Sequence, residues 1–97
     1  MFTIKFQDYA NKKAKKLVNK NKLLVEKIGK CLIRLKNNPF DPPLNTHKVN
    51  SKNFGFKYSS SITADLRFIW DFDESTEELE IIEILDIGGH SGKNSVY

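Results

Sequence analysis

The stretch ADLRFIWDFD, Ala64 to Asp73, alternates between apolar and other side chains with the period of two that is typical of a β-strand. One face would hold Leu66, Phe68, Trp70 and Phe72. The other face would hold Asp65, Arg67, Ile69 and Asp71. Because apolar faces are buried, we expect the first set to pack on helices and the second to remain polar and open.

Two similar segments flank this strand. GFKYSSSIT begins at Gly55, and LEIIEILDIG ends at Gly88. The turn-like Thr63 to Asp65 and the acidic Asp73 to Glu78 separate the three segments. Strands that follow one another with such short connections predict a three-stranded antiparallel meander.

The N-terminal half has a different period. FTIKF, residues 2–6, reads as a short strand, and residues 9–19 show a helical apolar stripe with Asp8 as its cap. A second stripe runs from Leu24 to Leu35 and ends at the NNP sequence before Phe40. The stripes contain Ala10, Ala14, Leu17, Val18, Leu24, Ile28, Cys31, Leu32 and Leu35. The short connection predicts an antiparallel helix pair with Cys31 in the core.

All three prolines lie between Pro39 and Pro43, so we expect residues 39–53 to form a long, functional loop. The predicted fold is α+β: a short N-terminal strand, an antiparallel helix pair, and a three-stranded antiparallel meander packed on the helices. With 97 residues, the chain is expected to form a single domain, residues 1–97.

Cysteine and histidine are scarce. One cysteine excludes an internal disulfide, and two histidines with one cysteine cannot by themselves complete a tetrahedral zinc site, so we expect neither a metal nor a cofactor. The chain shows no apolar signal core and no apolar run of the roughly 18 residues that a membrane span needs. We therefore expect a cytoplasmic protein that does not bind membranes.

Charge is distributed unevenly along the chain. Residues 1–57 hold 14 of the 16 Lys and Arg but only three acids, a net charge of +11, whereas residues 58–97 carry a net charge of −7. Such an asymmetric distribution of charge favours RNA or DNA as a partner. The alternative is that the helical lysines form only a solvated face.

The order strand, helix, helix and meander, together with LNTHKV, FKYSSSITADLRFIWDF, LDIGGH and the final VY, resembles the RelE/ParE superfamily of type II toxins, most closely its YafQ-like branch. Ser61 stands where well-known members carry a further histidine, and Leu66 where they carry an aromatic residue. Five residues separate His90 from Val96, against the usual two or three. The resemblance implies a ribosome-dependent mRNA interferase that is silenced by a cognate antitoxin in a hetero-oligomer.

The resemblance also implies roles for five catalytic-site residues. His90 is the main acid or base and His47 is a second site histidine. Asp65 and Arg67 face the RNA, and Tyr97 is the terminal aromatic residue. Histidine exchanges protons near neutral pH, and the planar guanidinium matches two phosphate oxygens. These groups suit RNA cleavage by the RNA's own 2′-hydroxyl, without a metal.

We expect Lys48, Lys52 and Lys57 to hold phosphates of mRNA or ribosomal RNA, with Ser61 beside them.

Each candidate residue also has a structural interpretation. His47 could bond a backbone carbonyl, and Arg67 could pair with Glu80 or Asp86 across the sheet. Asp65 could merely start the strand, Tyr97 could cap the core, and His90 could be structural. Two other functions stay open, a ParE-like toxin that poisons gyrase without nuclease activity and a catalytically silent RNA-binding module.

Overall fold

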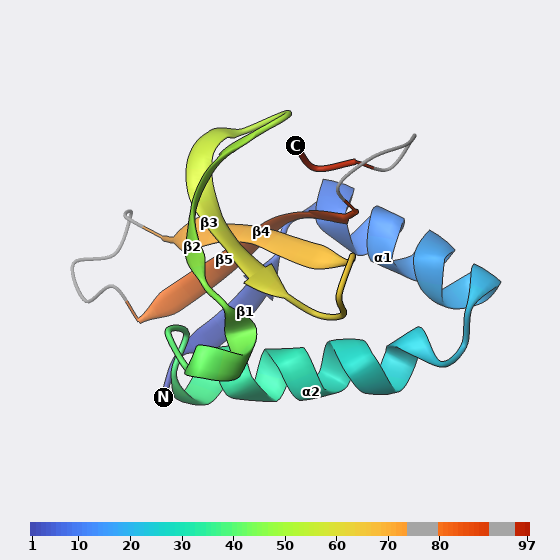
Figure 1. The fold of residues 1–97 in the computed structure, drawn as a ribbon, viewed down its shortest axis with the longest axis horizontal. Coiled ribbons are helices and arrows are strands. Elements are labelled where there is room, and N and C mark those ends of the chain that lie inside the picture. The colour runs from blue at the N-terminus through green and yellow to red at the C-terminus, as the bar shows by residue number, and fades with distance from the viewer. Residues whose placement is uncertain (74–79, 90–94) are drawn as a thin grey trace.

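One sheet and two helices make up the part of the chain that this computed structural model describes, residues 1–73, 80–89 and 95–97. The sheet has the strand order β1-β5-β4-β3-β2 (Figure 1). Its strands are β1 (Thr3–Phe6), β2 (His47–Ser51), β3 (Gly55–Ser61), β4 (Arg67–Phe72) and β5 (Ile81–Gly88). The helices are α1 (Asp8–Lys20) and α2 (Leu24–Asn37), and the 3-10 turn η1 (Pro42–Leu44) follows them.

The expected α+β fold is confirmed, but the sheet is larger than the predicted meander. Strand β1 joins β5 in parallel, with Phe6 opposite Ile84. The prediction of a loop over residues 39–53 is wrong, because this segment contains η1 and the edge strand β2, which pairs antiparallel with β3. Strand β2 is mostly exposed and Val49 is its only apolar residue, so its sequence lacks the alternation that reveals a half-buried strand.

The helices cover one face of the sheet as predicted. Phe68 and Trp70 are fully buried there beneath Cys31 and Leu35 of α2. The indole of Trp70 donates a hydrogen bond to Ser60 Oγ at 2.8 Å, so its polar atom is satisfied inside the core. Burial raises the pKa of the Cys31 thiol to about 12, which keeps this residue an uncharged core side chain.

Helix α1 begins one residue earlier than expected. Asp8 was expected to be the cap, but it lies in the first turn of the helix, where its negative charge suits the helix dipole. The capping position belongs to Gln7, whose side chain makes no capping hydrogen bond. It donates instead to the Glu83 carboxylate of β5.

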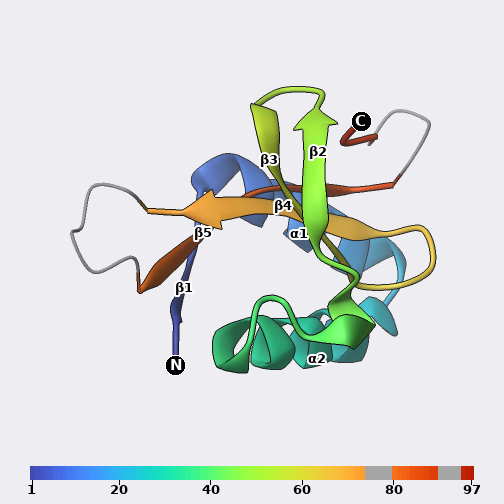
Figure 2. The same cartoon turned by 60° about the vertical axis from the view of Figure 1, so that its left-hand side comes forward.

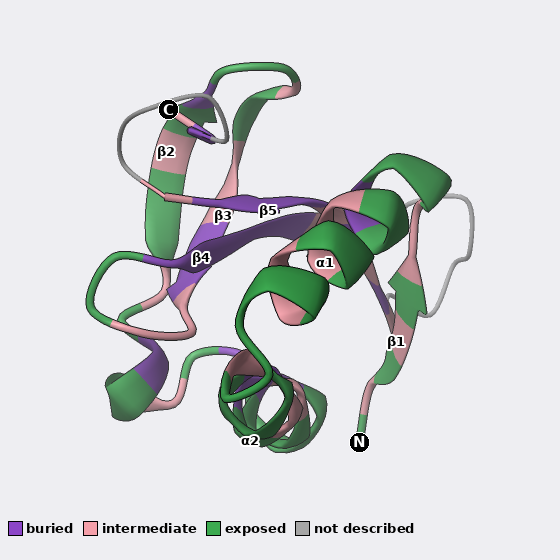
Figure 3. Ribbon diagram, turned by 90° about the vertical axis from the view of Figure 1, so that its right-hand side faces the viewer, coloured by how far each residue is buried: buried purple, intermediate pink, exposed green. Residues whose placement is uncertain are grey.

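The other face of the sheet is not open, which corrects the prediction. Ile69 is fully buried and Arg67 is only 8% exposed. The C-terminal residues 95–97 lie over this face: Val96 donates its N–H to the Gly89 carbonyl at 3.0 Å and accepts the N–H of Lys52 at 2.8 Å. Figure 3 shows the resulting burial along β4 and β5. The C-terminal residues thus connect the end of β5 with the turn between β2 and β3.

A buried ion pair fixes α1 to β5. Lys13 Nζ lies 2.7 Å from Asp86 Oδ1, and the Asp86 side chain is fully buried. The backbone N–H of Ile87 also donates to this oxygen at 2.8 Å. The second oxygen of Asp86 has no hydrogen-bond partner among the described residues. The Lys13 ammonium therefore offsets most of the desolvation cost of this buried carboxylate.

Replacing Lys13 by alanine should lower the free energy of unfolding by about 3–5 kcal/mol, because it leaves a buried carboxylate without its counter-ion. Urea unfolding at neutral pH measures this loss. Lys12→Ala, an exposed change on the same helix, is the matched control and should cost less than about 1 kcal/mol. Equal losses for both variants would show that the ion pair does not hold α1 in place.

Candidate functional site

The candidate site lies on the sheet face opposite the helices, where three strands place polar side chains in register. His47 of β2 is opposite Ser59 of β3, and Ser59 is opposite Ile69 of β4. Ile69 in turn is opposite Asp86 of β5. Residues directly opposite one another in antiparallel strands share a face, so this row crosses the sheet next to Arg67.

Ser59 joins two of the predicted site residues. Its hydroxyl oxygen lies 3.5 Å from Arg67 Nη1, which donates to it, and 2.6 Å from the hydroxyl of Tyr97. Ser59 is fully buried. The structure therefore brings Arg67 and Tyr97 together around one hydroxyl. Sequence reasoning missed Ser59, although the alternation in β3 places it on the same face as Ser61, which was predicted.

Asp65 lies two residues before the first residue of β4 and is exposed. A Cβ atom added to Gly89 would lie 2.6 Å from the Asp65 carboxylate oxygen Oδ2, so this carboxylate lies directly against the Gly89 backbone. A side chain at position 89 would require the Asp65 carboxylate to move away. The predicted catalytic histidine, His90, lies outside the described residues.

His47 is exposed at the start of β2, and its Nδ1 lies 2.8 Å from the carbonyl oxygen of Asn45. Because a carbonyl oxygen only accepts, Nδ1 donates this hydrogen bond and carries the proton. The backbone contact considered as the structural interpretation of His47 is therefore present. In the neutral ring it leaves the Nε2 lone pair able to accept a proton.

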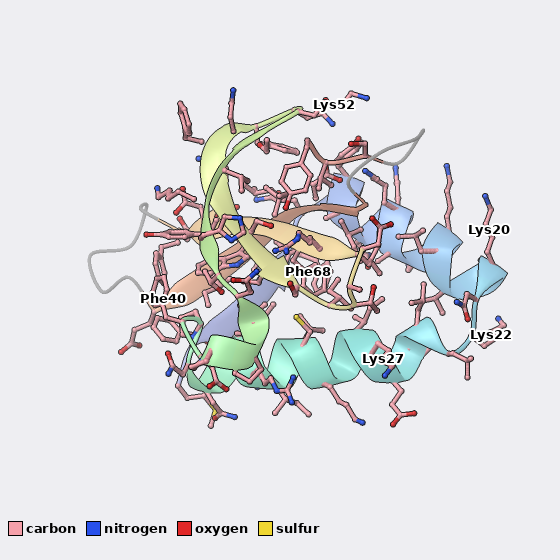
Figure 4. The ribbon with its side chains drawn as sticks, viewed as in Figure 1. Lys20, Lys22, Lys27, Phe40, Lys52 and Phe68 are labelled. Atoms are coloured by element: carbon pink, nitrogen blue, oxygen red, sulfur yellow. The ribbon has the colours of Figure 1, made fainter. Side chains whose placement is uncertain are left out.

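The predicted RNA-binding residues lie on different surfaces. Ser61 is opposite Arg67, and Lys57 pairs with Asp71 at 3.2 Å on the same side of the sheet. Lys48 lies on the helix side, with its ammonium 4.5 Å from the centre of the Tyr58 ring. Lys52 lies at the tip of the β2–β3 hairpin (Figure 4). The sheet therefore separates Lys48 from the site around Arg67.

The described residues also limit other kinds of site. Within residues 1–73, 80–89 and 95–97, no three His, Cys, Asp or Glu side chains come together in a way that could hold a metal ion. In the same part of the chain, no helix has the length and apolar character needed to cross a membrane. From the sequence, Glu80 and Asp86 are the candidate partners of Arg67. In the structure, Asp86 forms an ion pair with Lys13.

Solved structures share this arrangement of helices and strands. A YoeB/ParE toxin from Agrobacterium tumefaciens matches with a TM-score of 0.71 and 19% identity, over 93% of this chain and 100% of that chain. YoeB in a heterotetrameric YoeB–YefM toxin–antitoxin complex from Staphylococcus aureus matches with a TM-score of 0.68 and 22% identity, over 94% of this chain and 99% of that chain.

A third match is to the DinJ–YafQ complex from E. coli, with a TM-score of 0.67 and 18% identity over 93% of this chain and 94% of that chain. No protein-family model matches the chain, and no curated protein matches it by sequence. Identities this low establish the fold alone. The chain therefore has the fold of YoeB and YafQ, as its resemblance to the RelE/ParE superfamily predicts.

Proposed function

We propose that this chain is the toxin of a type II toxin–antitoxin system and that it cleaves mRNA on the ribosome. The observation that carries the proposal is the position of Arg67, whose guanidinium donates a hydrogen bond to Ser59 beside Tyr97, on the sheet face opposite the helices. A guanidinium stays charged at every physiological pH and offers two parallel donors to a phosphate. Arg67 is thus suited to stabilise the extra charge of a pentacoordinate phosphorus.

The proposed reaction uses the RNA's own 2′-hydroxyl. Its oxygen forms a bond to the adjacent phosphorus while a base accepts the proton, and the bond from phosphorus to the 5′-oxygen breaks as an acid protonates that oxygen. The products are a 2′,3′-cyclic phosphate and a 5′-hydroxyl. We assign proton transfer to His90 and His47, and charge stabilisation to Arg67.

Tyr97 and Asp65 have supporting roles in this proposal. Tyr97 stacks on a base or relays a proton, and Asp65 faces the RNA beside Gly89. Arg67 is only 8% exposed, so side chains around it must move before a phosphate can contact its guanidinium. Lys52 and Lys57 contribute electrostatic attraction to the RNA backbone.

The experiment that tests this function adds the purified chain to ribosomes programmed with a defined mRNA, in the presence of EDTA at a concentration that leaves ribosomal magnesium sufficient. Primer extension should show discrete cuts on the ribosome and none on naked RNA, with 2′,3′-cyclic phosphate ends. Uncut mRNA together with loss of DNA supercoiling by gyrase would instead select the ParE-like function. Inactivity in both assays would select the silent RNA-binding module.

In the same assay, His90→Ala should reduce cleavage by about 10²- to 10⁴-fold, the usual contribution of a positioned acid or base. His47→Ala should cost a comparable factor if its Nε2 transfers the second proton, and less if it only orients substrate. Thermal melts must accompany both variants. A folded His90→Ala chain that cuts at the parent rate would refute the assignment of His90.

The proposed partner is a cognate antitoxin with an acidic, amphipathic segment. An open apolar groove of about 510 Å³ lies between α1 and α2. Its lining includes Phe6, Ala14, Val18, Val25, Ile28 and Leu32. The two helices carry nine basic residues but only Asp8 and Glu26 as acids, which favours an acidic partner. YoeB forms a toxin–antitoxin complex with YefM, which supports a partner of this kind.

Co-expression with the neighbouring reading frame should relieve toxicity and yield a complex on purification. Val25→Asp introduces a charge into the groove lining at a half-exposed position and should weaken this complex at least about tenfold. Ile33→Asp is the matched control, since Ile33 is equally exposed on α2 but lies outside the groove lining. Equal effects of the two changes, or a chain tolerated at high expression without its partner, would contradict the proposal.

A further inference from the structure

The β2–β3 hairpin carries a strip of aromatic residues on the side of the sheet that faces the helices. In its register, Tyr58 is opposite Lys48 and Phe56 is opposite Asn50. Opposite residues share a face, and residues two apart on a strand do so as well, so these four side chains form one surface. We call them the hairpin strip. In Figure 2 the tip of this hairpin extends beyond the helices.

The rings of the strip differ in exposure. Phe56 is 72% exposed, although it is a large apolar side chain. Tyr58 is half-buried and stacks on Trp70, with ring centres 4.7 Å apart and planes at 23°. Phe40, which is 52% exposed, meets the Tyr58 ring edge-on at 5.5 Å and extends the aromatic surface toward the end of α2. The Tyr58 ring is thus held in place by Trp70, whereas the neighbouring Phe56 ring is exposed to solvent.

The charge around the strip is positive. From Leu44 to Thr63 the chain contains Lys48, Lys52 and Lys57 but no aspartate or glutamate. Lys57 points to the opposite face and is paired with Asp71 there. Lys48 lies over the Tyr58 ring at 4.5 Å, which places a cation directly beside an aromatic face.

We propose that the hairpin strip binds single-stranded RNA by base stacking, on the side of the sheet opposite Arg67. Exposed aromatic rings accept bases of any sequence, and an adjacent cation neutralises the phosphate of the stacked nucleotide. Phe56 and Tyr58 are about 7 Å apart along the strand, so a base stacked on the exposed Phe56 ring would lie near the Lys48 ammonium over Tyr58. The strip holds no aliphatic side chain and no carboxylate, so its chemistry favours a nucleic acid over an apolar protein segment.

This surface is separate from the proposed catalytic centre. Strand β3 presents Tyr58 on one face and Ser59, the residue that holds Arg67, on the other. RNA bound to the strip would therefore be anchored through the hairpin while the sheet face around Arg67 acts on a different nucleotide. Binding to the strip does not require that Arg67 take part in cleavage, so the two proposals can fail independently.

Fluorescence anisotropy with a labelled 2′-O-methylated single-stranded RNA tests the proposal, because this RNA lacks the hydroxyl that attacks during cleavage. Phe56→Ala should weaken binding about 5- to 150-fold, the usual contribution of one stacked base. Phe56→Leu should weaken it similarly, whereas Phe56→Trp should retain or improve it. Leu23→Ala, at another highly exposed apolar residue, is the matched control and should leave binding unchanged.

Lys48→Ala should also weaken binding and lower the magnitude of the logarithmic salt slope by about one unit, while Lys27→Ala on α2 should weaken it less. The same variants bound to ribosomes without mRNA distinguish ribosomal RNA from mRNA as the ligand. Full binding by Phe56→Leu with loss in Phe56→Ala would show an apolar docking surface and overturn the proposal. Unchanged binding in every Phe56 variant, or no binding by the parent chain, would overturn it as well.

Discussion

Burial of strand β4 on both faces is the constraint on which the rest of the structure depends. Phe68 and Trp70 pack under the helices, while Ile69 and Arg67 are covered on the other side. Covering the second face requires the C-terminal residues 95–97 to reach the β2–β3 turn. Strand β4 is therefore the centre of the fold, with the helices on one face and the C-terminal residues on the other.

This double burial explains the environment of Arg67. A guanidinium in a partly desolvated site interacts more strongly with an anion than one in bulk water, because the local dielectric constant is lower. The hydroxyl of Ser59 orients the guanidinium without neutralising its charge. The same burial limits the access of any ligand to the guanidinium.

The central strand, both helices and the core position of Cys31 could be predicted, because each has a clear apolar period. Strand β2 could not, since an exposed edge strand depends on pairing with β3 and not on its own pattern. Closure of the second face could not be predicted either, because it depends on contacts between residues far apart in the sequence, such as Lys52 with Val96. The alternation of apolar and polar residues along one strand does not predict such contacts.

The candidate site was predictable in its residue types but not in its grouping. Arg67 and Tyr97 both contact the hydroxyl of Ser59, which no motif singled out. The three lysines looked equivalent in sequence, but strand register places Lys48 and Lys57 on opposite faces. The structural interpretation of His47, a hydrogen bond to a backbone carbonyl, is present in the structure, with Nδ1 as the donor.

The central claim is that the Arg67 guanidinium stabilises the reacting phosphate. Single-turnover rates of mRNA cleavage on ribosomes test it most directly. We expect a loss of about 10²- to 10³-fold for Arg67→Ala and only partial recovery for Arg67→Lys, because two parallel donors are lost. The exposed Arg34→Ala should cause no change. A folded Arg67→Ala chain that cleaves mRNA as fast as the parent would contradict it.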